Sequence, residues 1–563
     1  MVPKAPWLAV YGTVPATLTY PDVSMAALLQ RAAQQYPTVR AYEFLGSRVS
    51  YAAFWREVER CARALTALGV RRGEAVTICM PNTPQALVMF YAVNAVGAVA
   101  AMIHPLSSEQ EIAFFVNTAK SRVALILDRL YPRFAAMKEQ TPLEILIVTG
   151  IGDGMKPPAK WGYAVTEGRK VPKIPKGEEV VLWKPFLRLS EEVRAFSLAP
   201  MRGDDTAVIL FSGGTTGVSK GVALTNLNFN ALALQTAAAG DCVVPGHRML
   251  AVMPLFHGFG LGVCVHTVLL HGVTCVLVPR FSAATYAKLL KKSRPHYIAG
   301  VPTLFEALLR DPHMNGVDLA RLEGVFCGGD SLSAELKHRV DAFLKEHGAQ
   351  VQVREGYGTT ECVTASCLTP KETYREGSIG VPFPDMYYKI VVPETEEPCE
   401  DGTVGEICIS GPTVMRGYVD NEAETARVLR RHADGRVWLH TGDVGYMDSE
   451  GFVYFRQRLK RVIITSGYNV YPSQIERVLN THPAVQTCAV IGVPDAYRGQ
   501  RVKAFVVLNE GVEANASTEA SLRAHCEKGV ARYAMPAAFV FRKALPTTRV
   551  GKVAYAELER EEN

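Results

Sequence analysis

Short apolar segments alternate with segments of helical periodicity along much of the chain, and this pattern constrains the fold more than any other feature. Between residues 23 and 147 the strand-like segments are AVTICM, AVAAMI, VALIL and LEILIV. Such alternation predicts parallel sheets covered by helices, and it resumes over residues 205–391. We therefore expect an α/β fold with layered sheets.

The rest of the chain departs from this pattern in three places. Residues 150–197 are rich in Gly, Pro and Lys, and we interpret them as a long surface insertion. Residues 405–454 carry short strand-like segments joined by turns, which predicts a β-rich subdomain. The C-terminal part is an α+β unit of about 100 residues, the size of an independent domain. We therefore divide the chain into a large domain, residues 1–457, and a small one, residues 458–563.

Two apolar stretches are long enough to raise the question of membrane spans. Residues 86–106 are interrupted at Asn94 and Gly97, and residues 261–278 contain two histidines and Gly272. We interpret both as a helix, a glycine turn and a buried strand. The N-terminus does not resemble a signal peptide. The twelve cysteines contain no CxxC pair, which predicts buried free thiols and a reducing, cytoplasmic compartment.

The charge balance limits the classes of partner. The net charge is +6, and charged residues make up 21% of the chain. This excess is too diffuse for nucleic acid, which calls for clustered Lys and Arg, so no nucleic-acid partner is expected. It fits an anionic small molecule, although a solvated surface of mixed charge explains it equally well. The basic loop around Trp161 and Tyr163 could contact the inner membrane peripherally, and a solvated loop is the simpler interpretation.

A glycine-rich segment, SGGTTGVSKG at residues 212–221, follows a predicted buried strand at residues 206–211. Its glycines let backbone N–H groups turn toward an anion, and its hydroxyls and Lys220 suit a polyphosphate. A Walker A loop is excluded because Lys220 precedes glycine rather than Ser or Thr. Ser219 lies in a G-x-S-x-G match, but a hydrolase serine would directly follow its strand, and six to seven residues intervene here. A merely structural glycine loop remains the third alternative.

The segment resembles the phosphate-binding loop of the adenylate-forming superfamily, which comprises acyl-CoA synthetases, luciferases and the adenylation domains of peptide synthetases. Four further motifs of that family recur in order: EGYGTTE at residues 355–361, TGD at 441–443, RLK at 458–460 and PTTRVGK at 546–552. Five ordered motifs are jointly specific, and the resemblance covers essentially the whole chain. It implies an AMP-forming acid–thiol ligase whose small C-terminal domain is mobile and carries a catalytic lysine.

The resemblance also assigns roles by position. It makes Lys552, Thr360 and Glu361 catalytic, with Glu361 as the ligand of Mg²⁺. It makes Lys460 the hinge between the domains, and it places the path of coenzyme A along Ser466, Gly467 and Tyr468. The ATP site would comprise Ser212, Gly213, Gly214, Thr215, Thr216, Gly217, Lys220, Gly328, Gly329, Gly356, Tyr357, Gly358, Thr359, Asp443 and Arg458.

Within the ATP site, the resemblance lets Tyr357 stack on adenine and Asp443 accept hydrogen bonds from the ribose diol. Arg458 would contact the ribose as well. The chain departs from the family's pattern beside the hinge, at Gln457 and Arg461, and near the catalytic lysine, at Tyr555.

The implied chemistry has two steps. A carboxylate attacks the α-phosphorus of Mg-ATP to give an acyl-adenylate and pyrophosphate, and the thiol of coenzyme A then displaces AMP. Amino-acid-activating members place an aspartate in the segment that corresponds to residues 253–261, MPLFHGFGL, and no acid occurs here. An apolar acyl chain is therefore expected, with His257 and Phe259 in its pocket.

The insertion at residues 150–197 looks like that of bacterial long-chain fatty acid–CoA ligases, which favours a medium- or long-chain fatty acid. Three alternatives stay open: an aryl or other carboxylic acid, an acceptor other than coenzyme A, and a non-catalytic lipid-binding or transport protein. Monomer and homodimer are both compatible with the sequence.

Overall fold

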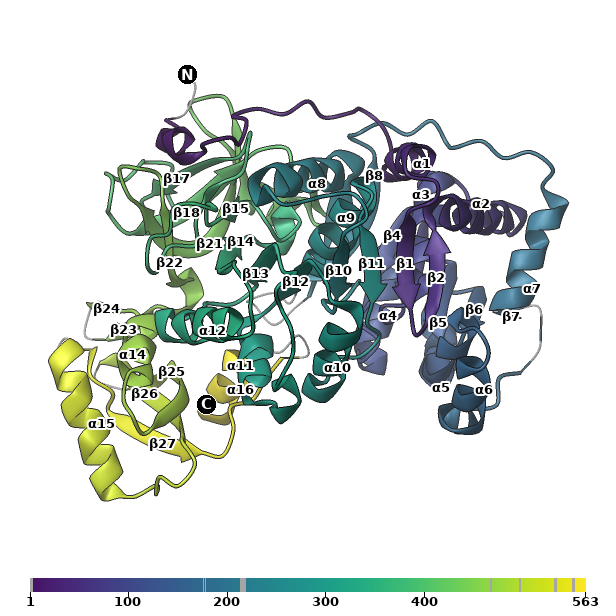
Figure 1. Ribbon diagram of the computed structural model, residues 1–563. Coiled ribbons are helices and arrows are strands. Elements are labelled where there is room, and N and C mark those ends of the chain that lie inside the picture. Colours follow the sequence, from purple (N-terminus) through teal and green to yellow (C-terminus); the bar gives the residue numbers. More distant parts are fainter. Residues whose placement is uncertain are drawn as a thin grey trace.

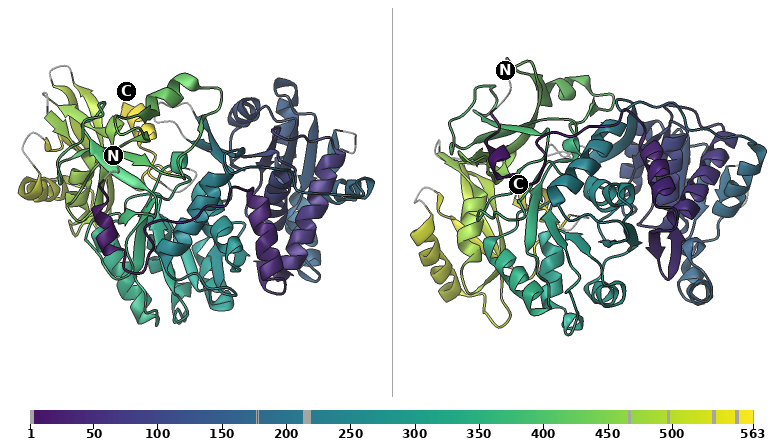
Figure 2. Two further views of the ribbon diagram at one scale, coloured as in Figure 1. Left: turned by 90° about the horizontal axis from the view of Figure 1, so that it is seen from above. Right: turned by 45° about the horizontal axis from the view of Figure 1, so that its top comes forward.

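The computed structural model describes residues 4–175, 177, 179–212, 219–465, 468–495, 498–530, 534–548 and 552–562. Two large sheets with their helices form the body of the molecule, and two smaller sheets lie toward one end of it (Figure 1). The views in Figure 2 agree that the C-terminal unit, in yellow-green, is remote from the N-terminal sheet, in purple and blue. The fold is mixed α/β, as the alternation of apolar segments predicts.

The first large sheet contains the four strands expected between residues 23 and 147. Its order is β19-β9-β8-β4-β3-β5-β6-β7, and the strands from β8 to β7 in this order run parallel. The strands are β3 (Ala75–Cys79), β4 (Val99–Met102), β5 (Val123–Leu127), β6 (Ile145–Thr149), β7 (Val180–Leu182), β8 (Thr206–Ser212), β9 (Lys220–Thr225) and β19 (Gly417–Tyr418).

The second large sheet has the order β16-β15-β14-β13-β12-β10-β11-β1-β2, with a parallel centre from β14 to β1 and antiparallel pairs at both ends. Its strands are β1 (Arg40–Phe44), β2 (Ser47–Ser50), β10 (Arg248–Ala251), β11 (Thr274–Leu277), β12 (Tyr297–Gly300), β13 (Gly324–Gly328), β14 (Val353–Tyr357), β15 (Cys367–Leu368) and β16 (Val381–Pro382).

Helices cover and separate the two sheets. Every residue of α3 is buried, and a helix that is apolar on all sides belongs between layers. The helices are α1 (Met25–Gln35), α2 (Tyr51–Ala67), α3 (Pro84–Ala95), α4 (Glu109–Ala119), α5 (Tyr131–Met137), α6 (Ala159–Val165), α7 (Trp183–Arg188), α8 (Asn226–Gly240), the π-helix η7 (Phe259–Thr267), α9 (Val268–Leu270), α10 (Ala283–Ser293), α11 (Pro302–Arg310) and α12 (Ala334–Glu346).

Both apolar stretches have the form expected from the sequence. Helix α3 leads through Gly97, at φ 79°, into β4, and η7 with α9 leads through Gly272, at φ 71°, into β11. Within the described ranges, no helix combines the length and the apolar character that a membrane crossing needs. All twelve cysteines are free thiols, and ten of them are buried.

Residues 150–197 are more ordered than a surface insertion. They form α6, β7 and α7, and β7 extends the first sheet by pairing in parallel with β6. Trp183 and Phe186 of α7 are buried, whereas Trp161 of α6 keeps 67% of its surface exposed. The prediction of a surface insertion is therefore wrong for the second half of the segment. A strand of three residues is too short to show the alternation that identifies strands in a sequence.

The β-rich subdomain is a five-stranded antiparallel sheet of order β17-β18-β21-β20. Strand β22 pairs with the second half of β21, from Asp443 to Met447, whereas β20 pairs with its first residues. The N-terminal helix η1 (Pro6–Val10) packs on this sheet through Trp7, which joins Phe452 in a small core. The elements of the β-rich subdomain are β17 (Tyr387–Val391), β18 (Gly405–Ser410), α13 (Glu422–Val428), β20 (Leu429–Arg431), β21 (Val437–Met447) and β22 (Val453–Arg458).

The C-terminal unit has its own sheet, of order β24-β23-β26-β25 with β27 beside β26, and two apolar clusters of its own. Strand β22 ends at Arg458, and the short helix η10 (Leu459–Arg461) connects it to this sheet; the domain division at 457/458 stays a prediction. The elements are β23 (Ile463–Thr465), β24 (Tyr468–Val470), α14 (Pro472–Asn480), β25 (Val485–Asp495), β26 (Gly499–Leu508), α15 (Ala516–Gly529), β27 (Ala538–Arg542) and α16 (Tyr555–Glu562).

Candidate active site

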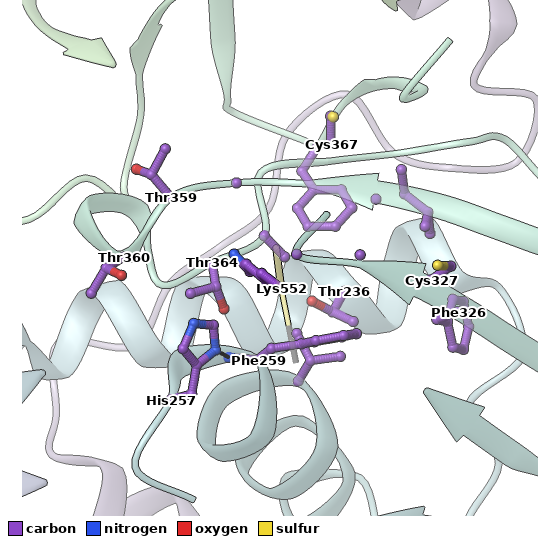
Figure 3. Close-up of a pocket in the computed structure, with 18 of the residues that line it drawn as sticks. Thr236, His257, Phe259, Phe326, Cys327, Thr359, Thr360, Thr364, Cys367 and Lys552 are labelled. Atoms are coloured by element: carbon purple, nitrogen blue, oxygen red, sulfur yellow. Dashed lines mark hydrogen bonds between the residues drawn. The ribbon is translucent and has the colours of Figure 1, made fainter. Parts of the chain in front are cut away.

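A cavity lies where the carboxyl ends of β13 and β14 meet the start of η7 and the C-terminal loop that carries Lys552 (Figure 3). Ligands of open α/β sheets bind at the carboxyl ends of the strands. Ten residues predicted from the sequence line this cavity: His257, Phe259, Gly328, Gly329, Gly356, Gly358, Thr359, Thr360, Arg458 and Lys552.

Glycines at the two strand ends keep the floor of the cavity free of side chains. Gly328 and Gly356 are paired across β13 and β14. A Cβ on Gly328 would lie 3.0 Å from the carbonyl oxygen of Gly356, closer than a side chain normally packs. A Cβ on Gly329 would lie 3.8 Å from Cε of Lys552. The missing side chains therefore let both a ligand and the lysine approach the backbone closely.

Asp443 joins two other predicted residues at the edge of the cavity. It pairs with Arg458 across β21 and β22, it is 1% exposed, and its Oδ2 accepts a hydrogen bond of 2.6 Å from the Tyr357 hydroxyl. Arg458 Nε lies 2.8 Å from Oδ1 as an ion pair. No hydrogen bond from the described residues reaches this buried Oδ1. Oδ1 is therefore paired in charge with Arg458 but accepts no aligned hydrogen bond, and it keeps a lone pair that a ligand hydroxyl could use.

Glu361 and Lys220 meet through Tyr418, a residue that sequence reasoning missed. The Tyr418 hydroxyl donates a hydrogen bond of 2.9 Å to Glu361 Oε1, and Lys220 Nζ lies 5.0 Å from the centroid of the Tyr418 ring. Lys220 also forms an ion pair with Glu424 at the start of α13. The half-buried Glu361 carboxylate offers the oxygen ligands that Mg²⁺ prefers.

The electrostatics of the cavity depend on Lys552. Burial lowers the pKa of this amine, and nearby Arg458 lowers it further, whereas Asp330 and Asp443 oppose the shift. Burial and the charge of Lys552 lower the pKa of His257 to about 3, so its ring is neutral near pH 7. Lys552 therefore presents a positive charge to an entering ligand, whereas the charge of Arg458 is paired with Asp443, and an anion is the ligand that Lys552 favours.

Several predicted residues lie elsewhere or outside the described part of the chain. Ser212 ends β8 and is paired with Lys220 of β9, so both flank the glycine-rich loop. Lys460 belongs to η10 and Tyr468 begins β24, and neither is among the residues that line the cavity. Seven predicted residues are outside the described ranges: Gly213, Gly214, Thr215, Thr216, Gly217, Ser466 and Gly467.

The backbone around Ser219 argues against a hydrolase. A nucleophile elbow is a turn from a strand into a helix. Here β8 and β9 form an antiparallel hairpin, and Lys220 directly after Ser219 already belongs to β9. The G-x-S-x-G match therefore lacks the geometry that the hydrolase chemistry needs.

The sequence did not identify most of the apolar wall of the cavity. This wall comes from α8, η7, β13 and the segment after β14, elements that are far apart along the chain. It contains Val263, Phe326, Cys327, Ala365, Cys367, Leu368 and Phe383. Thr236 and Thr364 line the cavity as well, and their buried hydroxyls have no hydrogen-bond partner among the described residues. In the sequence, the stretch VCVHTVLL at residues 263–270 predicts part of this wall, and its Val263 lines the cavity.

Comparison with known proteins places these observations in a family. Residues 29–419 match the AMP-binding enzyme family, and residues 474–552 match the AMP-binding enzyme C-terminal domain. A long-chain-fatty-acid–CoA ligase of Bacillus subtilis (strain 168) is 34% identical over 569 residues, which covers 100% of this chain and 99% of that protein. A long-chain-fatty-acid–CoA ligase of Salmonella typhimurium is 31% identical, over 99% of this chain and 98% of that one.

A solved structure shares the same architecture at full length. The crystal structure of ATP-bound MatB from Rhodopseudomonas palustris has a TM-score of 0.82 and 26% sequence identity. The similarity covers 95% of this chain and 98% of that one. The likeness therefore includes the small C-terminal unit as well as the two large sheets.

Proposed function

The chain belongs to the AMP-binding enzyme family and is an AMP-forming acid–CoA ligase that uses ATP, Mg²⁺ and coenzyme A, and on that premise we propose that its acid is a medium- or long-chain fatty acid. The observation that carries the proposal is the composition of the cavity. Its charged lining residues are the two cations Arg458 and Lys552, and most of its remaining side chains are apolar. A carboxylate can therefore meet Lys552 while its hydrocarbon chain lies among apolar groups.

The named relatives support the same choice of substrate. Two of them, at 34% and 31% identity over nearly the whole chain, are long-chain-fatty-acid–CoA ligases. The cavity wall adds a physical reason, because each buried methylene of an acyl chain contributes about 0.8 kcal/mol of transfer free energy.

We assign the nucleotide to the groups around the strand ends. Asp443 Oδ1 would accept a hydrogen bond from a ribose hydroxyl, because it is buried and receives none from the described residues. Tyr357, held by Asp443, would contact the adenine, and Arg458 would lie beside the ribose. The hairpin of β8 and β9, with Lys220 at its base, would face the phosphates.

The first chemical step then follows from charge and position. One oxygen of the acid forms a bond to the α-phosphorus of ATP, and the bond from that phosphorus to pyrophosphate breaks. Lys552 would neutralise the charge shared by the carboxylate and the α-phosphate, and the Thr360 hydroxyl would donate a hydrogen bond to the same phosphate. Glu361 would hold Mg²⁺, which supplies charge neutralisation for the phosphates when bound.

The second step requires Lys552 to leave. We propose that the C-terminal unit turns about Lys460, which withdraws Lys552 and brings the segment at residues 466–468 toward the thiol of coenzyme A. The thiolate sulfur then attacks the acyl carbon, a thioester forms, and AMP leaves with the oxygen that the acid had contributed to phosphorus.

A panel of acids tests the choice of substrate. AMP release would be measured with MgATP, with and without coenzyme A, for saturated fatty acids of increasing length and for benzoate- and cinnamate-type acids. We expect kcat/KM to rise with chain length and AMP release to require coenzyme A. A preference for aryl acids over every fatty acid would refute the proposed substrate, and AMP release that ignores coenzyme A would refute the acceptor.

A further inference from the structure

The TGD segment at residues 441–443 interrupts the ladder between β18 and β21. Glu406 is paired with Val444, and Cys408 is paired with His440. One residue of β18 separates these pairs, whereas Thr441, Gly442 and Asp443 separate them on β21. The segment is therefore a β-bulge, a device that redirects a side chain, and here the redirected side chain is that of Asp443.

Side chains replace the ladder hydrogen bonds that the bulge removes. Glu406 Oε1 accepts a hydrogen bond of 2.9 Å from the Gly442 N–H, and the Thr441 hydroxyl donates one of 2.7 Å to the Ile407 carbonyl. Gly442 has φ 68°, a left-handed conformation that favours glycine. Glu406 thus fixes the Thr441–Gly442 peptide, one peptide before Asp443, and the Asp443 N–H itself donates a hydrogen bond of 3.0 Å to the Thr441 hydroxyl.

A chain of two histidines fixes Glu406 in turn. Its Oε2 lies 2.9 Å from His440 Nδ1, and His440 Nε2 lies 2.9 Å from His432 Nε2. Glu406 and His440 are each 5% exposed and His432 is 4% exposed, so water does not compete for these bonds. With Glu406 ionised, His440 donates a hydrogen bond from Nδ1 to Glu406 and accepts one at Nε2 from His432 Nε2. Each of these two contacts then holds one proton.

We infer that Glu406, held by His440 and His432, is a positioning residue that aims Asp443 at the ribose of ATP. The inference rests on the proposed contact between Asp443 and the ribose. It extends the site to a buried carboxylate that touches no substrate and that lies outside the five motifs.

The test compares two substitutions of Glu406. In Glu406→Gln the amide oxygen still accepts from the Gly442 N–H. The amide nitrogen can donate to His440 Nδ1 once the His440 proton moves to Nε2 and the His432 proton moves to Nδ1, so the bulge is kept. In Glu406→Leu both bonds are lost. The readout is the ratio of kcat/KM for ATP to that for 2′-deoxy-ATP, because overall destabilisation lowers both values alike. We expect Glu406→Leu to lower this ratio about tenfold and Glu406→Gln to change it by less than about threefold.

Matched variants separate the possible outcomes. Glu397→Gln, at an exposed position between β17 and β18, should keep the wild-type ratio. If Glu406→Leu does not fold, Glu406→Asp takes its place, because the shorter side chain keeps the charge but draws the carboxylate back from the Gly442 N–H. A wild-type ratio in the folded variant would overturn the inference. If Asp443→Ala also keeps the ratio, the ribose contact itself is wrong and the inference falls with it.

Metal analysis of the purified protein adds an independent arm. Ligand atoms of Glu406, Cys408 and His440 lie within 4.8 Å of one another, a spacing that a metal ion could bridge. The hydrogen-bonded chain predicts no stoichiometric metal there. One equivalent of zinc in the wild-type protein that Glu406→Leu loses would overturn the positioning role in favour of a structural metal site.

Discussion

Two carboxylates of the site are predicted to bind different groups, one the metal ion and the other the nucleotide. Glu361 is the predicted ligand of Mg²⁺, and its carboxylate receives a hydrogen bond from Tyr418. Asp443 is the predicted ribose acceptor, and burial raises its pKa against the opposing charge of Arg458. Glu361 is therefore held by Tyr418, and Asp443 is paired with Arg458. The two carboxylates are still close enough for the charge of Glu361 to raise the pKa of Asp443.

We expect Glu361→Gln to raise the Mg²⁺ concentration needed for half-maximal adenylation by about tenfold, because the amide lacks the negative charge that binds the ion. The measurement is the rate of pyrophosphate release at saturating ATP over a Mg²⁺ titration. Glu422→Gln, at an exposed position of α13, is the control. An unchanged midpoint in Glu361→Gln would exclude the proposed metal role.

Short motifs at strand ends made part of the site predictable at this scale. Tyr357 and Asp443 each lie at the end or interruption of a strand, where a local pattern specifies a local geometry. The sequence could not show that Tyr418 joins Glu361 to Lys220, or that His432 and His440 hold Glu406. Such contacts depend on strand register and on pairs of residues far apart along the chain.

Among the elements, the π-helix η7 shows how close packing shapes the cavity wall. A Cβ on Gly260 would lie 2.1 Å from the carbonyl oxygen of Pro254, so only glycine fits there. His266 in η7 is fully buried, its Nδ1 lies 2.9 Å from the Tyr91 hydroxyl, and its Nε2 lies 3.0 Å from Asn230 Oδ1. The ring thus ties η7 to α3 and α8.

The burial of His266 should make the stability of the protein depend on pH. Burial lowers the pKa of His266 from 6.5 to about 3, so the unfolded chain binds a proton over this range that the folded protein does not. Its contribution to stability is complete above pH 6.5 and is lost as the pH falls toward 3, by about 1.4 kcal/mol per pH unit. We expect the difference in unfolding free energy between wild type and His266→Gln to shrink accordingly between pH 6.5 and 4.

Urea unfolding at several pH values measures this difference. Val165→Ala is the control, because Val165 is 57% exposed and carries no titratable group, so the difference between wild type and this variant should not depend on pH. A difference between wild type and His266→Gln that stays constant from pH 6.5 to 4 would show that His266 is not held neutral by burial.

Periodicity predicted most elements, and its failures have physical causes. The strands β3 to β6 and the helix-turn-strand units at Gly97 and Gly272 follow from apolar runs and glycine turns. The strand β7 was missed because three residues at a sheet edge gain their stability from β6 rather than from their own pattern. The π-helical form of η7 depends on packing against α8, which the sequence alone does not reveal.

At the scale of the whole molecule, the active site is assembled from parts with separate cores. The cavity walls belong to the second large sheet with α8 and η7, Asp443 belongs to the β-rich subdomain, and Lys552 comes from the C-terminal unit. The loop of Lys552 is closed on itself by backbone hydrogen bonds between Pro546 and Ala554 and between Thr548 and Lys552. The proposed rotation of the C-terminal unit would therefore withdraw Lys552 without breaking these hydrogen bonds.

We propose that Lys552 serves the adenylation step alone, and Lys552→Ala tests this role when the two half-reactions are measured separately. Pyrophosphate release from MgATP and a fatty acid should fall by about 100-fold or more, because the charge that stabilises the transition state is gone. Thioester formation by Lys552→Ala from a supplied acyl-adenylate and coenzyme A should stay within about twofold of wild type. The control Lys543→Ala, at an exposed position, should stay within about twofold of wild type in both half-reactions. An equal loss of both half-reactions in Lys552→Ala would contradict the account.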